Sequence, residues 1–178
     1  MKKTTKLGII AGGLVVSLAS LAPLTTYAAT GTSTVNVTVN PTITIDSTTN
    51  ASLTADSTRV ETTTFSAKVT TNKAYTISLH APTSTALTAS GTTDTIPAAS
   101  TLTAGTNGWG VKKKAADNSA TDAAGYTAIT GTAVPFYTAT AGTGAAGVTT
   151  SFTVGVAISS TITAGSYSTG LTVTAANS

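Results

Sequence analysis

The sequence holds few residues that could do chemistry, and its single histidine is the first of them. His80 lies two residues after Ser78, so in an extended strand the imidazole and the hydroxyl share one face. A histidine so placed could act as a general base toward the serine. No Asp or Glu lies near His80 in the sequence, however, and no Gly-x-Ser-x-Gly motif occurs. We therefore predict no catalytic residue and a protein that is not an enzyme, with a secreted hydrolase as a remote alternative.

A glycine-rich motif matches the dinucleotide-binding pattern in its letters. Gly142 to Gly147 reads Gly-x-Gly-x-x-Gly. That motif binds a pyrophosphate when a helix begins directly after it, and it uses an acidic residue about 20 positions later for the ribose. Here the residues from Val148 onward alternate as in a strand, and no acidic residue follows Asp122. We predict a loop and no bound cofactor.

Two further clusters carry charge. The carboxylates of Asp117 and Asp122, with side-chain oxygens between them, could hold a calcium ion, although the glycine and the terminal glutamate of an EF-hand loop are missing. One histidine and no cysteine leave little for a transition metal, so we predict no metal site and leave calcium open. The run Lys112, Lys113 and Lys114 is a candidate contact for an anionic wall polymer or lipid headgroup; the alternative is a solvated loop.

The basic character of the chain belongs to its first residues. The formal net charge is +3, from 9 basic and 6 acidic residues. Three of the lysines lie at positions 2, 3 and 6, before the uncharged run from Leu7 to Ala22, and small residues follow near Ala28. This order is typical of a secretory signal peptide over residues 1–28, cleaved before Ala29; retention as an N-terminal membrane anchor is the alternative. The remaining basic and acidic residues are equal in number, so nucleic acid is excluded as a partner.

The segment after this signal alternates strictly between apolar and polar residues. The odd positions from Val35 to Ile45 are apolar or proline, and the even positions are Asn or Thr. Such a pattern is typical of a strand, but this one is about twice the ordinary length. Pro41 removes a ladder donor in its middle, so two strands meeting there are one interpretation and an edge strand is the other.

Shorter alternating segments follow along the chain. Phe65–Thr70 and Tyr75–Ala81, separated by a turn at 71–73, predict a hairpin. Trp109–Val111, Val134–Thr138, Phe152–Ile158 and Tyr167–Ala175 predict further strands. Residues 82–105 and 112–125 are interpreted as long loops. We predict an all-β fold: one immunoglobulin-like β-sandwich of seven to nine strands over residues 29–178, preceded by a signal-peptide helix.

Several of these segments together resemble a known family. They are STVNVTVNPTITID at the start of the mature chain, TNKAYTISLHA, NGWGV and ITAGSYSTGLTVTA. The pattern is similar to the spore-coat-U and archaic chaperone–usher pilin subunits. It implies an incomplete immunoglobulin-like sandwich whose N-terminal strand pairs with a neighbour. That family usually has a disulfide near its first strand, and this chain contains no cysteine.

Two other resemblances are present. The Trp109-Gly110-Val111 segment is similar to the Trp-x-Leu cell-wall domain, with Val in place of Leu and no second copy. The overall layout also resembles small cysteine-free secreted sandwiches of ultrasmall, host-attached bacteria. All of these resemblances imply a protein that works outside the cell.

We therefore expect a secreted, non-enzymatic structural or adhesive protein of a bacterial cell surface. Its partners would be cell-envelope components, host-surface components or further copies of itself, with membrane contact only through an uncleaved signal segment. The alternative is a pilus-type subunit that polymerises by donating residues 33–45 as a strand. In that case the residues that pair with the partner are Val35, Val37, Val39, Ile43 and Ile45.

Overall fold

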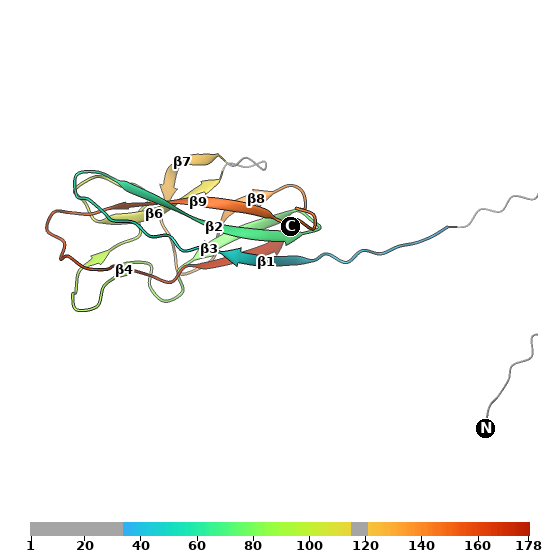
Figure 1. Ribbon diagram of the computed structural model, residues 1–178, viewed down its shortest axis with the longest axis horizontal. Coiled ribbons are helices and arrows are strands. Elements are labelled where there is room, and N and C mark those ends of the chain that lie inside the picture. Colours follow the sequence, from blue (N-terminus) through green and yellow to red (C-terminus); the bar gives the residue numbers. More distant parts are fainter. Residues whose placement is uncertain (1–33, 115–120) are drawn as a thin grey trace, which may run out of the picture. The chain divides into compact units, whose positions relative to one another are not determined.

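The computed structural model describes residues 34–114 and 121–178, and the predicted signal peptide lies outside them. The domain from Val39 to Ser178 is all-β, with no helix among the described residues. Its larger sheet contains five antiparallel strands in the order β1 (Ile43–Thr48), β2 (Glu61–Thr71), β9 (Val148–Ala157), β6 (Gly108–Lys114) and β7 (Asp122–Thr127) (Figure 1). These strands form one layer of the fold.

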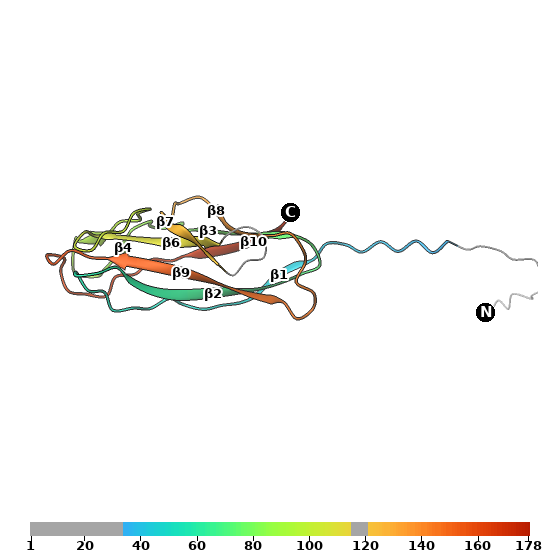
Figure 2. The ribbon, with the colours of Figure 1, turned by 90° about the horizontal axis from the view of Figure 1, so that it is seen from above.

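The second layer is a sheet of three antiparallel strands. β3 (Tyr75–His80) lies in its middle, between β10 (Thr172–Asn177) and β8 (Val134–Ala139). Figure 2 shows the layers from above. A small hairpin of β4 (Leu87–Thr88) and β5 (Thr95–Ile96) is a third sheet. The all-β, sandwich-like fold is confirmed. The described residues contain ten strands where seven to nine were predicted, and two of the ten, β4 and β5, have only two residues each.

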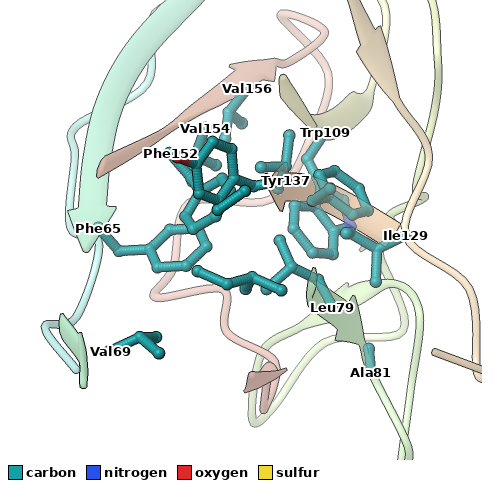
Figure 3. Packing of buried hydrophobic residues seen from close by; sticks show 14 of the residues in the cluster. Phe65, Val69, Leu79, Ala81, Trp109, Ile129, Tyr137, Phe152, Val154 and Val156 are labelled. Atoms are coloured by element: carbon teal, nitrogen blue, oxygen red, sulfur yellow. The ribbon is translucent and has the colours of Figure 1, made fainter. Parts of the chain in front are cut away.

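The alternating patterns build the core between the layers. Period-two alternation sends successive side chains to opposite faces, so one row of each strand points inward. In β3, and in β2 from Phe65 onward, these rows are nearly inaccessible to solvent. Phe65 stacks on Phe152 of β9 with ring centroids 5.3 Å apart. Figure 3 shows how this cluster fills the space between the sheets. The inward rows and loop residues that form the core are Phe65, Val69, Tyr75, Ile77, Leu79, Ala81, Ile96, Trp109, Val111, Ile129, Phe136, Tyr137, Ala139, Phe152, Val154 and Val156.

The predicted hairpin of residues 65–81 was wrong. β2 and β3 are consecutive in sequence, but β2 pairs with β1 and β9 while β3 pairs with β8 and β10. The connection at residues 72–74 therefore carries the chain from one sheet to the other. Both segments have one apolar row, which fits two facing sheets as well as it fits a hairpin.

The predicted long loops were also partly wrong. Residues 82–105 contain β4 and β5, and the ends of the predicted loop 112–125 belong to β6 and β7. The aliphatic stem of a lysine can cover apolar surface while its ammonium group stays accessible to water, so a run of lysines can belong to a strand. Lys112 lies over the Tyr126 ring and Lys113 over the Phe136 ring, which explains how β6 continues through a run of charges.

The strand predicted to begin near residue 33 begins at Ile43 instead. Residues 34–42 have no strand assignment, although the alternation extends through them. Pro41 has no N–H group and so cannot donate to a ladder. Two strands meeting at Pro41 are not observed, since no strand precedes it among the described residues; β1, which follows it, is the edge strand of its sheet.

Candidate functional site

The first component of the candidate site is the N-terminal segment, defined here as residues 34–40. Its apolar residues are strongly exposed: Val35 by 83%, Val37 by 78% and Val39 by 74%. Among the described residues the one other exposed large hydrophobic side chain is Val148, which is much less exposed, at 43%. Every second side chain of the segment is thus a β-branched apolar group in water, which is the pattern of one face of a strand.

The second component is a flank of the domain where the two sheets meet without a strand between them. β1 is the edge of the five-stranded sheet and β10 is an edge of the three-stranded sheet, and the two lie side by side (Figure 2). Their inward residues are only half-buried, whereas the inward row of β3 is nearly inaccessible. We call these half-buried residues the β1–β10 seam: Ile43, Ile45, Leu171, Val173 and Ala175.

The seam is closed at one end by a buried threonine. The Thr71 hydroxyl lies 2.8 Å from the Thr42 carbonyl oxygen and 2.8 Å from Asn177 Oδ1, and it donates toward these two acceptors. Thr71 is 2% exposed, so these bonds lie away from water. A buried hydroxyl needs partners, and here they are the residue directly before β1 and the last residue of β10.

The third component is the asparagine beside this threonine. Asn72 Oδ1 accepts a hydrogen bond from the Thr42 backbone N–H at 2.9 Å, and Asn72 Nδ2 donates to the Asn40 carbonyl oxygen at 3.0 Å. One carboxamide therefore binds the backbone on both sides of Pro41. We call this pair of bonds the Asn72 clamp.

Sequence analysis named the residues of the segment and of β1 but missed Thr71, Asn72 and β10 as parts of the same region. The sequence predicts a turn at residues 71–73, whereas Thr71 is the last residue of β2 and the chain bends at Asn72 and Lys73. The available signal was an unbroken inward row in β10 matching that of β1. Nothing in the sequence says that two strands at opposite ends of the chain become neighbours.

A recess of about 230 Å³ lies elsewhere in the domain, at the β8–β9 connection. It is lined by Tyr75, Tyr137, Ala139, Ala141, Gly142, Thr143 and Val148. Burial raises the pKa of both tyrosines, so these hydroxyls stay protonated and neutral at physiological pH. The two rings meet edge to face with centroids 5.9 Å apart. Its walls carry no charged side chain, and sequence analysis did not anticipate it.

The three predicted lysines are divided between the faces of β6. Lys112 and Lys114 lie on one face and Lys113 on the other, because side chains alternate along a strand. Lys112 Nζ is 5.3 Å from the centre of the Tyr126 ring, and Lys114 Nζ is 2.6 Å from Asp122 Oδ1. The structure thus gives these lysines roles in packing, and their contact with an anionic surface stays a prediction.

The remaining candidates are also placed. His80 is half-buried on β3, and no hydrogen bond or ion pair joins it to a carboxylate in the part of the chain that the structure describes. Gly142–Gly147 forms the β8–β9 loop, and the strand predicted after it is confirmed, since β9 begins at Val148. Of the two carboxylates proposed as calcium ligands, Asp117 lies outside the described residues and Asp122 forms an ion pair with Lys114. Within residues 34–114 and 121–178, no group of three His, Asp or Glu side chains could hold a metal.

No protein-family model, curated protein or solved structure matches this chain. Within the described ranges, no helix has the length and apolar character needed to cross a membrane.

Proposed function

We propose that this protein is an exported, non-enzymatic structural or adhesive protein of the cell surface. The signal-peptide pattern of residues 1–28 supports export, and the absence of a nucleophile–base–acid motif in the sequence supports a non-enzymatic role. Intact cells treated with an external protease should lose the protein while cytoplasmic markers persist. N-terminal sequencing of the exported form should give Ala29 as the first residue. Full protection from the protease would contradict a surface location.

The sandwich is proposed to be immunoglobulin-like. In that class strands A, B, E and D form one sheet, and C, F and G form the other. The order β1-β2-β9-β6 fits the first sheet, and β3 next to β10 fits C next to F. No strand takes the place of G beside β10 among the described residues. This order supports the proposal of an incomplete immunoglobulin-like sandwich.

A second and more specific candidate is a subunit that polymerises by strand donation, and one observation carries it. Val35, Val37 and Val39 are exposed in a segment with strand alternation, while the β1–β10 seam presents half-buried apolar residues beside an unfilled edge. A segment of this kind can add to a sheet edge through main-chain hydrogen bonds and place alternate side chains in the gap. We therefore propose that residues 34–40 of one copy occupy the seam of another.

Deletion of residues 30–45 tests this candidate in a simple way. The deletion also removes the start of β1, so it should abolish multimers and lower stability together. Point substitutions within residues 34–40 separate the two effects, since those side chains are exposed. Multimers that persist after the deletion would contradict strand donation.

A further inference from the structure

If strand donation operates as proposed above, residues 34–40 must be kept out of the β1–β10 seam of their own copy. We propose that the Asn72 clamp is a positioning device that holds residues 40–42 extended. By holding residues 40–42 extended, the clamp prevents residues 34–40 from folding back beside β1 of the same copy. The occupant of the seam is then the segment of a second copy of this chain.

The chemistry of the sequence makes folding back a real competitor. Residues 34–39 alternate in the same phase as β1, so a hairpin with its turn at Asn40-Pro41-Thr42 would direct the valines toward the seam. Asn-Pro is also a common turn-initiating dipeptide. The free edge of β1 would accept such a hairpin without any change in the rest of the sheet.

The observed contacts oppose this turn. A tight reversal at residues 40–42 needs the backbone groups of Asn40 and Thr42 to approach each other or to turn outward. Here the Asn40 carbonyl oxygen and the Thr42 N–H are instead both bound by the Asn72 carboxamide, at 3.0 and 2.9 Å. The proline ring adds a second restriction, because it keeps the residue before it in an extended conformation.

The clamp is itself held in place. Thr71, the neighbour of Asn72, donates toward the Thr42 carbonyl oxygen and accepts a bond from the Lys73 N–H at 3.2 Å. The Thr71 carbonyl oxygen accepts bonds from the N–H groups of Thr143 and Gly144. The turn that carries Asn72 is therefore fixed to β1 and to the β8–β9 loop, so the carboxamide is oriented before any partner arrives.

The absence of cysteine allows a direct test. Val37→Cys and Val173→Cys are introduced together, so that a strand in the seam brings the two thiols close. Oxidation should link Cys pairs between copies, giving covalent dimers and larger species on a non-reducing gel. Adding Asn72→Ala should shift most of the product to an internally linked monomer, a several-fold change in the ratio of monomer to multimer links. Asn50→Ala, at an exposed asparagine outside the clamp, is the matched control and should leave the ratio unchanged.

The outcomes separate this inference from the function on which it rests. An unchanged ratio in the Asn72→Ala protein overturns the clamp, while cross-links between copies still support strand donation. Internally linked monomers with Asn72 intact would also overturn it. If the double-cysteine protein with Asn72 intact shows no links between copies, and the native protein shows no association, strand donation itself fails. Asn72→Asp keeps the acceptor for Thr42 but loses the donor to Asn40, so it should give an intermediate ratio. A purely structural role for Asn72 would lower stability without producing the internal link.

Discussion

Among single residues, Gly110 lies so close to neighbouring backbone that a substitution can test its packing. A Cβ at this position would lie 2.5 Å from the Ala99 carbonyl oxygen and 3.1 Å from the Thr127 carbonyl oxygen. Both neighbours are backbone atoms, so neither can rotate away. We expect Gly110→Ala to lower the free energy of unfolding by about 1–3 kcal/mol, measured by urea denaturation. Gly125→Ala in the adjacent strand meets nothing within 4 Å and is the matched control; equal losses in both variants would contradict the packing described for Gly110.

A second residue-scale prediction concerns Asp122. Partial burial raises its pKa, but hydrogen bonds from Lys114 and Thr153 and the charges of Lys114 and Lys112 lower it more. The pKa of Asp122 therefore lies below 3.8. A carboxyl whose pKa is lower in the folded state binds fewer protons there than in the unfolded chain. Its contribution to stability is therefore present above pH 3.8 and is lost as the pH falls through the folded-state pKa.

Asp122→Asn checks this sign. The variant should be less stable than the native protein at pH 7, because Lys114 loses its ionised partner 2.6 Å away. It should also lose less stability than the native protein when urea unfolding is repeated at pH 3. A pH dependence identical to that of the native protein would show that Asp122 does not contribute through its charge.

At the scale of elements, Thr71 joins strands that belong to different sheets. Its hydroxyl donates toward the carbonyl oxygen of Thr42, the residue directly before β1, and toward the Asn177 side chain at the end of β10. Thr71→Val keeps the shape but leaves these acceptors without their donor, so we expect a loss of about 1–3 kcal/mol in the free energy of unfolding. Thr62→Val, on the exposed row of the same strand, should change it by less than about 0.5 kcal/mol. Similar effects of the two substitutions in thermal or urea unfolding would contradict the bridging role.

Alternation in the sequence was enough to predict most strands and their inward rows. Phe65, Tyr75 and Phe152 all lie in the core where the pattern put them. Pairing between strands could not be read in the same way, because one apolar row fits a hairpin and two facing sheets equally well. The lysines of β6 were misplaced in a loop because charge alone does not show that Tyr126 and Phe136 receive their stems.

The candidate site was predictable in one half only. The over-long alternating segment predicts Val35, Val37 and Val39 as pairing residues, and these side chains are exposed. The acceptor depends on β1 and β10 lying side by side, which joins residues more than 120 positions apart. The clamp depends on the side chain of a turn residue, and turn propensity gives no information about its partner.

At the scale of the whole molecule, strand donation between copies is the central claim, and three exposed valines carry it. Burial of each valine in a seam would contribute about 1.5–3 kcal/mol, which is enough to drive association when added to main-chain hydrogen bonds. Exposed residues make few internal contacts, so substituting them should leave the domain intact. The claim therefore predicts a large effect on assembly with little effect on folding.

Sedimentation velocity of the purified protein over a range of concentrations tests this most directly. The native protein should form multimers that grow with concentration. A variant with Val35→Thr, Val37→Thr and Val39→Thr keeps the β-branched shape and should stay monomeric, with unchanged circular dichroism and unfolding midpoint. A native protein that is monomeric at every concentration, or a triple variant that assembles as the native protein does, would contradict strand donation.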